Sequence, residues 1–558
     1  MRRIPFLIAA AFAASLLFSS CKNKTTGLAI PKDAVMVLHV NTSSLTSKLS
    51  WNEIKASNWF KEMSEDEHDS LTKKLLENPE NSGIDLKSDF VLFMRREGTG
   101  GYMACEGSLK DANAFEAMVK NVSHGAETQK NGDLKFIKTG EHDIVSWTSS
   151  KFVTMSDAPF FHEVSPFGRR SYPSNNEKFS TDSLKKFTSD LFSLSSSDNL
   201  EKDKRFSSLL NEKGDVHFWM NYDQYVSSVG AGFLSMLKIG SLMEGNAITY
   251  TLNFDDGKIS VKSKTFFGKE MANLMEKFKP RTITKELIDR IPSQNVVGAI
   301  AFSFDPAGLK EFFRASGLDG FINGFAGEIG MNMDELVNAT GGDFLFAAGD
   351  FSLQKKTITI PPYSSESKPY TYNKTEPDGK FLFATSVHDR SSFEKILGIV
   401  KEKIGMGEDS SQLSMKMNNN WFVLSNKAET ANQFLSGGSN NVPFASKITG
   451  HPFGMYVDFQ KLIKGLSSEV DNAADSAAYD ASLKMWQDAI GTGGEYHNGE
   501  SSMVFEINLV DKTKNSLKQI NEYADKMNAA RKLRHHGYNV AGTDSTVVRP
   551  IEITPNTK

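Results

Sequence analysis

Cysteines are scarce in this sequence, and neither sign of charge is in excess. Its 558 residues include only 2 cysteines, so no disulfide framework holds the fold together. The 64 lysines and arginines nearly balance the 68 aspartates and glutamates, which gives a net charge of −4. A chain with this balance lacks the basic surface that nucleic-acid binding requires. We therefore exclude nucleic acid as a partner and expect a body stabilised by its apolar core.

No apolar run is long enough to span a membrane, and this includes the one at the N-terminus. There, two arginines precede the apolar run 4–18, which is shorter than the roughly 20 residues that a membrane-spanning helix needs. A basic start, a short apolar run and small residues in this order are typical of a secretory signal peptide. The small residues Ser19 and Ser20 lead directly into Cys21. We expect residues 1–20 to be removed during export.

The sequence before Cys21 resembles the lipobox of bacterial lipoproteins, because Leu-Phe-Ser-Ser-Cys ends in the cysteine that those proteins acylate. Cys21 would then begin the mature protein, and 21–29 would be a lipidated tether. Two or more acyl chains anchor a protein stably, since each buried CH2 contributes about 0.8 kcal/mol. By the sorting rules of bacterial lipoproteins, Lys22 implies the outer membrane, and we expect its periplasmic face. A soluble secreted protein, cut by the ordinary signal peptidase, is the alternative.

Segments of the first half of the chain recur in the second half in the same order. The stretch that begins at Ile30 is similar to the one that begins at Ile291, and 108–119 is similar to 386–397. A preserved order with drifting spacing predicts a tandem duplication of a two-unit module. The predicted organisation is a copy 1 N-terminal unit at 30–158, a linker at 159–186, a copy 1 C-terminal unit at 187–290, a copy 2 N-terminal unit at 291–436, a copy 2 C-terminal unit at 437–528 and a polar tail at 529–558.

Alternating apolar residues and short turn signals predict strands joined as hairpins. Met36–Val40 alternates in this way, and Asp256-Gly257 and Asn498-Gly499 are two-residue turn signals between strand-like runs. Helices are predicted at Phe266–Phe278 and Lys512–Met527. Because hairpins outnumber regular strand-helix-strand crossovers, we favour an α+β fold with largely antiparallel sheets covered by helices over an α/β fold.

Short matches to catalytic and metal motifs do not form a consistent set. Ser70-x-x-Lys73, Ser197-Asp198-Asn199 and Lys138-Thr139-Gly140 resemble the motifs of serine β-lactamases, but the last two occur in the wrong order for that family. His535 and His536 are adjacent and would not share a helix face. The glycines of 491–494 are interpreted as turns near a hairpin. We expect neither a metal nor a cofactor.

Differences between the two copies indicate where one copy has gained a task. The insertion 353–379 in copy 2 predicts a long hairpin or a protruding loop, and its Tyr363, Tyr370 and Tyr372 are candidates for partner contact, with a solvated loop as the simpler interpretation. Cys105 aligns with the apolar position of Phe383 and is predicted to be a buried thiol. Two further segments differ from the other copy: the apolar run Val229–Met243, predicted to be a buried helix, and the linker segment Pro159–Asn176 with Arg169 and Arg170.

The opening segment Leu28–Leu45, LAIPKDAVMVLHVNTSSL, together with the anchor and the repeated units, resembles an uncharacterised bacterial lipoprotein family, domain of unknown function 4836. That resemblance implies a location and a class, without catalytic or binding residues. We therefore expect a non-enzymatic, lipid-anchored envelope protein that binds a protein, glycan or lipid partner. An envelope hydrolase acting on glycan or peptidoglycan is one alternative, and a structural spacer is the other.

Overall fold

The structure, a computed structural model, describes residues 27–65, 70–98, 100–158, 178–229, 237–278, 281–361, 369–404, 413–438 and 440–541. Within them, 18 strands form a sheet. The strands are β1 Ala34–Val40, β2 Phe90–Glu97, β3 Gly100–Ser108, β4 Gln129–Asn131, β5 Leu134–Gly140, β6 Asp143–Trp147, β7 Lys151–Asp157, β8 Val216–Asn221, β9 Ala247–Asp255, β10 Lys258–Phe266, β11 Val296–Ser303, β12 Thr340–Ile360, β13 Tyr370–Val387, β14 Ser414–Met417, β15 Trp421–Ser425, β16 Phe453–Asp458, β17 Trp486–His497 and β18 Glu500–Leu509.

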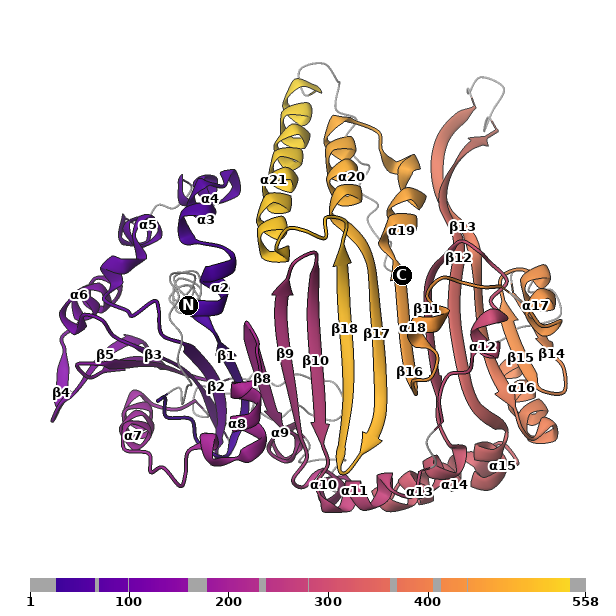
Figure 1. Cartoon of the computed structure of the whole chain (residues 1–558), viewed down its shortest axis with the longest axis horizontal. Helices are drawn as coiled ribbons and strands as arrows, with labels where there is room; N and C mark the ends of the chain where they lie inside the picture. Colours follow the sequence, from indigo (N-terminus) through magenta and orange to yellow (C-terminus); the bar gives the residue numbers. More distant parts are fainter. Residues whose placement is uncertain are drawn as a thin grey trace, which may run out of the picture.

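The strands pair antiparallel throughout, in the order β4-β5-β6-β7-β3-β2-β1-β8-β9-β10-β18-β17-β16-β11-β12-β13-β15-β14. The predicted α+β class with antiparallel strands is confirmed. Where the prediction spoke of several sheets, the structure has one, because β10 and β18 join edge to edge (Figure 1).

The strand order is similar on the two sides of the central β10–β18 pair. Moving outward, β9, β8, β1, β2, β3 and β7 follow β10, while β17, β16, β11, β12, β13 and β15 follow β18. Two related copies that meet at their last strands would have this order. Common descent of the two halves stays a prediction.

Helices pack on both faces of the sheet at its two ends and line its upper and lower edges (Figure 1). They are α2 Thr42–Lys48, α3 Trp51–Ala56, α4 Asn58–Glu65, α5 Ser70–Glu77, α6 Ala112–Val122, α7 Thr181–Phe192, α8 Lys204–Asn211, α9 Tyr222–Val229, α10 Ile239–Met243, α11 Lys269–Met275, α12 Lys285–Asp289, α13 Pro306–Ser316, α14 Asp319–Glu328, α15 Met333–Asn338, α16 Arg390–Ile404, α17 Ala428–Leu435, α18 Ala445–Ile448, α19 Phe459–Gly465, α20 Ala473–Met485 and α21 Ser516–Ala541, with 3-10 turns η1 Pro79–Ser82, η4 Leu200–Lys202 and η6 Ser467–Glu469.

Each end of the sheet has its own apolar core. At the N-terminal end, α7 and α8 cover one face through Leu184 and Phe206, and α2 to α6 cover the other through Trp51 and Phe115. At the opposite end, α12, α17 and α18 cover the first face. Helix α16 covers the second face there through Phe393. These cores fix the ends of the sheet and leave its middle strands between them.

The predicted turns and helices are largely found. Asn498 and Gly499 have φ values of 51° and 83° between β17 and β18, which fits a type I′ hairpin turn, and Gly257 has a φ of 66° between β9 and β10. The two predicted helices correspond to α11 and α21. The glycines at 491–494 lie within strand β17, so their interpretation as turns is wrong.

Several predicted features lie outside the described residues. These are Cys21, most of the linker with Arg169 and Arg170, residues 230–236 of the apolar segment, Tyr363, and the side chains of Ser70, His535 and His536. Of the apolar segment, Ile239–Met243 forms α10, in which Leu242 is buried. None of the helices in the described ranges is both long and apolar enough to cross a membrane.

Candidate functional site

One face of the sheet carries apolar side chains that continue across the central strands. Residues opposite each other on paired strands point to the same face, and alternate residues along a strand share that face. We call the set below the apolar face. Its three cross-strand rows are Leu38, Phe218, Tyr250, Ser263, Met503, Gly493, Phe453, Phe302 and Phe344; then Val216, Leu252, Val261, Phe505, Gly491, Met455, Ile300, Phe346 and Phe383; then Phe254, Ile259, Ile507, Ala489, Val457, Gly298, Ala348 and Phe381.

The apolar face contains no charged residue and is partly open to solvent. Ile300, Phe346 and Phe381 are 41%, 46% and 41% exposed, although strand residues of this kind are usually covered. In Figure 1 no described helix crosses strands β10, β18 and β17 between the helices of the upper edge and those of the lower edge. A contiguous exposed apolar surface of this kind is typical of a binding site.

Aromatic rings pack closely over the β11, β12 and β13 part of the apolar face. Phe302 and Phe344 stack with ring centroids 4.9 Å apart, and Phe346 and Phe383 lie 4.7 Å apart. Gly491 leaves space for the ring of Phe505, since a Cβ there would lie 2.6 Å from its Cδ1 atom. These contacts make a surface of aromatic rings that offers dispersion contacts and no hydrogen-bonding groups.

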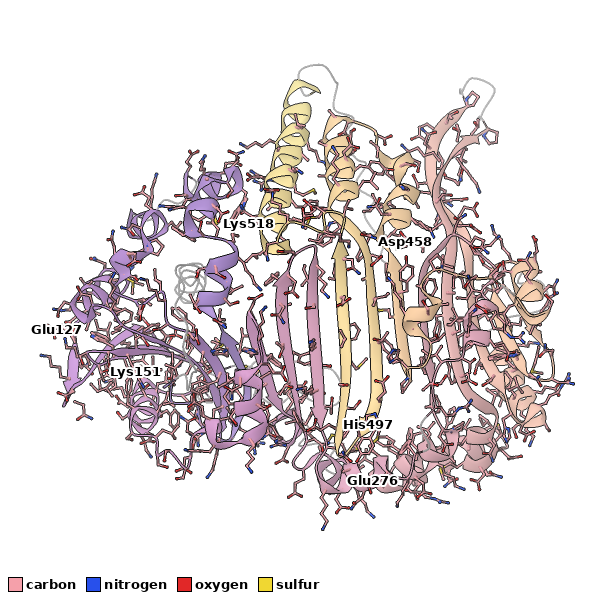
Figure 2. All side chains as sticks on the ribbon, in the orientation of Figure 1. Glu127, Lys151, Glu276, Asp458, His497 and Lys518 are labelled. Carbon is pink, nitrogen blue, oxygen red and sulfur yellow. The ribbon has the colours of Figure 1, made fainter. Side chains whose placement is uncertain are left out.

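The opposite face of the same strands is polar. Lys258 of β10 and Glu506 of β18 form an ion pair of 2.6 Å, and Lys264 pairs with Glu212. Figure 2 shows Lys518 of α21 near one end of the central strands and His497 of β17 near the other. The central sheet is therefore amphipathic, with one charged face that suits water and one apolar face that does not.

Helices border the apolar face on two sides. Leu45 of α2, Trp51 of α3 and Leu517 of α21 belong to the same apolar cluster as Phe254. At the other end, Phe393 and Ile396 of α16 belong to the same apolar cluster as Phe383. Since these helices contact the same face as the three rows, they flank the rows on both sides.

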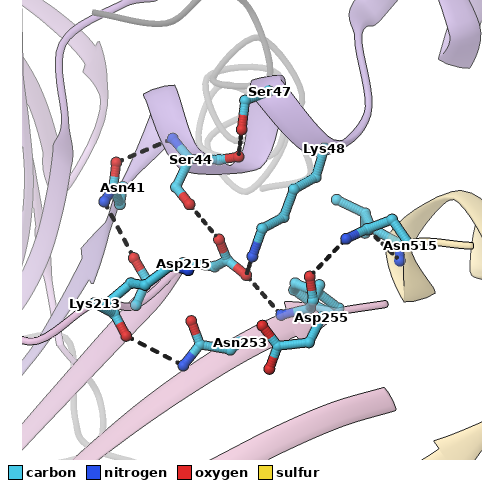
Figure 3. Close-up of polar contacts among 12 residues, drawn as sticks. Asn41, Ser44, Ser47, Lys48, Lys213, Asp215, Asn253, Asp255 and Asn515 are labelled. Carbon is cyan, nitrogen blue, oxygen red and sulfur yellow. Dashed lines mark hydrogen bonds and ion pairs between the residues drawn. The ribbon is translucent and has the colours of Figure 1, made fainter. Parts of the chain in front are cut away.

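Asp215 fixes α2 at the border of the apolar face (Figure 3). Its carboxylate is fully buried and accepts hydrogen bonds from Ser44 Oγ at 2.6 Å and from the backbone N–H of Phe254 at 2.6 Å. Lys48 Nζ lies 2.5 Å from the second carboxylate oxygen. Because Ser44 and Lys48 belong to α2 while Phe254 belongs to β9, this one side chain holds the helix to the sheet.

A buried pair of histidines lies on the polar side of the sheet. His39 Nε2 is 3.1 Å from Asp89, and His39 Nδ1 is 3.0 Å from His217 Nδ1. Burial, with a smaller effect of His39, lowers the pKa of His217 to about 4, so His217 is neutral at pH 7. Its Nε2–H can donate to the carbonyl of Glu212 at 3.2 Å, and its Nδ1 then accepts from His39. Asp89 and both histidines are too buried to reach a substrate, which favours a structural role for their hydrogen bonds.

Two neighbouring residues of β3 are also buried. Cys105 is a free, buried thiol, as predicted, and burial raises its pKa to about 12. Burial raises the pKa of Glu106 to about 8, against the opposing hydrogen bond from the backbone N–H of Ala29 at 3.0 Å. A thiol with this pKa stays protonated at neutral pH and is a poor nucleophile.

The residues of the β-lactamase-like motifs serve local structure where their contacts are described. Asn199 caps η4 and donates to the carbonyl of Leu28 at 2.9 Å, and Asp198 pairs with Lys32 at 2.7 Å. Lys138 and Gly140 lie within β5. In the part of the chain that the structure describes, no three metal-ligating side chains come together.

The predicted protruding hairpin is formed by β12 and β13, which pair up to Ile360 and Tyr370. Tyr370 and Tyr372 are 65% and 38% exposed, and their rings stack with centroids 6.0 Å apart. They lie on the extension of β13 beyond Phe381, outside the three rows of the apolar face. The apolar face and this hairpin both expose large apolar side chains to solvent.

Comparison with known proteins identifies the family. The model of the family described as "Domain of unknown function (DUF4836)" matches residues 28–437. The chain belongs to this family. No curated protein matches it. Two solved structures, crystal forms I and IV of TP0453, align with a TM-score of 0.23 and 13% identity, over 44% and 46% of this chain and 81% and 87% of those chains, a likeness too low to support a functional argument.

Sequence reasoning missed the apolar face, although a signal was present. Three Phe-x-Phe pairs occur in the chain: Phe302 with Phe304, Phe344 with Phe346, and Phe381 with Phe383. Each pair places two rings on the same side of a strand. Only the pairing of β11 with β12, and of β12 with β13, shows that the three Phe-x-Phe pairs share one face.

Proposed function

We propose that this member of the family is a lipid-anchored cell-envelope protein that binds the acyl chains of lipids on its apolar face. The single observation that carries the proposal is the set of three cross-strand rows without a charged residue, in which Ile300, Phe346 and Phe381 are exposed. A non-enzymatic binding role agrees with the buried state of the histidine pair and of Cys105.

The chemistry of the apolar face selects an apolar ligand. The backbone groups of its strands are paired with neighbouring strands, so the face offers side-chain surface and few hydrogen bonds. Each CH2 group that leaves water contributes about 0.8 kcal/mol, so a chain of about 16 carbons gains on the order of 10 kcal/mol before the costs of binding. A glycan or a polar peptide would gain little there.

The borders of the apolar face favour acyl chains over a second sheet. Neighbouring strands lie about 4.8 Å apart, so the eight strands from β8 to β12 span roughly 34 Å. Helices α2, α3 and α21 flank this width on one side and α16 on the other. A flat sheet from another protein would meet these helices before it reached the rows, whereas a narrow, flexible chain fits between them.

Anchoring through Cys21 would hold the body of the protein close to a membrane, which is a source of such lipids. Leu28 and Ile30 are buried, so residues 22–27 of the tether separate Cys21 from the body. Six residues reach at most about 20 Å when extended. We propose the periplasmic face of the outer membrane as the location, following the sequence before and after Cys21.

Binding is tested with the mature chain carrying Cys21→Ala and with palmitate and a phospholipid as probes, followed by calorimetry. We expect Ile300→Asp and Phe346→Asp to weaken binding at least tenfold, because each places a charge among the rows. Lys262→Ser, on the polar face of β10, is the matched control and should bind like the parent. Absence of binding by the parent chain, or equal binding by all variants, would refute the proposal.

Anchoring is tested separately in cells. The Cys21→Ala variant should move from the membrane fraction to the soluble fraction, because it has lost its acylation site. A variant that stays in the membrane fraction contradicts anchoring through Cys21. This outcome leaves the binding measurement unaffected, since that measurement already uses unlipidated protein.

A further inference from the structure

The β12–β13 hairpin extends beyond the rest of the sheet. The last β12 residue paired with β11 is Gly349, and the β13 residues paired with β15 begin at Leu382. Within Ser352–Ile360 and Tyr370–Asp378, strands β12 and β13 pair with each other and with no other described strand. Figure 1 shows this two-stranded ribbon rising above the neighbouring strands. We call it the ribbon.

Contacts with the 3-10 turn η6 and the residues after it brace the base of the ribbon. Ser468 Oγ donates to the carbonyl of Leu353 at 2.7 Å, and Thr375 Oγ1 donates to Glu469 at 2.9 Å. Lys355 also pairs with Asp471. The direction of the ribbon is therefore fixed by the body of the protein, and its outer rungs are presented to the surroundings.

The outer rungs of the ribbon have one apolar side and one polar side. Ile358 lies opposite Tyr372, and Ile360 lies opposite Tyr370. Ile360, Tyr370 and Tyr372 are 49%, 65% and 38% exposed. On the other side, Thr357 bonds to Asn373 at 3.0 Å and Thr359 lies 3.3 Å from Thr371. The large apolar groups are thus exposed together, on one side of the ribbon.

Polarity changes in order along that apolar side. Behind the Ile358–Tyr372 rung comes Lys356 opposite Lys374, and both lysines form ion pairs with Glu376. Two cations and one anion leave a net positive charge there. Successive rungs on one side are about 6.7 Å apart. From the outermost described rung inward, the order is therefore aliphatic and aromatic groups first, and then a cationic level roughly 13 Å behind the Ile360–Tyr370 rung.

We propose that the apolar side of the ribbon inserts into the interfacial region of a lipid bilayer that contains anionic lipids. Tyrosine is enriched at the membrane interface, and lysine extends toward lipid phosphates, in the order that the ribbon shows. A stable protein interface buries about 800 Å² on each partner. Four side chains on two rungs fall short of that area, whereas a membrane needs no matching surface. This contact is additional to the proposed binding of acyl chains on the apolar face.

The test uses the mature chain carrying Cys21→Ala, so that no lipid anchor contributes, and flotation with vesicles of phosphatidylethanolamine and phosphatidylglycerol. The double variant Ile360→Ser with Tyr370→Ser should bind vesicles at least tenfold more weakly. Thr359→Ser with Thr371→Ser alters the other side of the same rungs and should bind like the parent. The altered residues are exposed, and equal thermal midpoints will show that both variants fold.

Insertion has a second readout. A fluorophore attached to the thiol introduced by Ile360→Cys should shift its emission to the blue with vesicles, while buried Cys105 stays unlabelled. The proposal is overturned if the parent chain does not float, if both double variants lose binding equally, or if the ribbon is captured by a protein and ignores vesicles. The Ile360→Ser with Tyr370→Ser variant should still bind palmitate, so failure of the ribbon proposal is distinguishable from failure of the apolar-face proposal.

Discussion

Replacement of Asp215 by alanine should destabilise the protein more than any exposed ion-pair substitution. Asp215 has no exposed surface, and Lys48, its ion-pair partner, is 16% exposed. Alanine would leave the Lys48 ammonium without its partner and the Phe254 N–H without its acceptor. Loss of one member of a buried pair costs about 3–5 kcal/mol, because the remaining charge is desolvated and unpaired. We expect a loss of that size in the free energy of unfolding.

The measurement is urea unfolding followed by tryptophan fluorescence, because Trp51 follows α2 directly in the chain and is buried in the core that α2 covers. Lys48→Met should cost less, since methionine brings no charge to the site. In the double variant Asp215→Ala with Lys48→Met, the loss should be smaller than the sum of the single losses, because no unpaired charge remains. Asp215→Asn tests whether the loss in the free energy of unfolding comes mainly from the charge of Asp215 or from its hydrogen bonds.

Lys32→Met is the matched control. Lys32 and Asp198 also form an ion pair of 2.7 Å, but their side chains are 64% and 49% exposed. Water solvates both charges there, so the variant should unfold at the same urea concentration as the parent. A loss under about 1 kcal/mol for Asp215→Ala, or an equal effect of Lys32→Met, would refute the role assigned to Asp215.

Buried residues give three further predictions. Burial raises the pKa of Glu106 from 4.5 to about 8, so the native state keeps a proton that the unfolded state releases, and the free energy of unfolding should fall as pH rises from about 4.5 to about 8. Glu106→Gln should remove this slope and stabilise the protein at pH 7 by up to about 3 kcal/mol, measured by urea unfolding across pH; an unchanged slope contradicts the assignment. In the Cys21→Ala variant, Cys105 should react with a thiol reagent only after unfolding, because burial raises its pKa to about 12; rapid labelling of folded protein would count against this. Gly491→Val should displace the Phe505 ring, cost about 1–3 kcal/mol of stability and weaken palmitate binding, whereas Gly499→Ala, at the β17–β18 turn, should leave palmitate binding unchanged.

Much of the local structure could be predicted from the sequence, because short-range physics fixes it. Asn498-Gly499 forms the hairpin turn that its tolerance of positive φ indicates. The helix predicted at Lys512–Met527 corresponds to α21. The interpretation of the glycines at 491–494 as turns is wrong, because these residues lie in strand β17. Gly491 leaves space for the ring of Phe505, and only the packed structure creates that requirement.

The candidate site could be predicted only in part. Tyr370 and Tyr372 were selected because the insertion 353–379 is absent from the first half, and the hairpin does expose them. The apolar face could not be found this way, because Leu38, Val261 and Ile300 are far apart in the chain and each alone looks like an ordinary core residue. Their common face depends on which strands become neighbours.

Sequence patterns are enough to predict the α+β class, the antiparallel hairpins, the buried state of Cys105 and an N-terminal lipid anchor. These depend on residue order over a few positions, or on similarity between segments. Only the folded chain shows that β10 and β18 join two halves into one sheet, and that three apolar rows run across it. Strand pairing brings together residues hundreds of positions apart, so a surface built by pairing cannot be inferred from any single segment.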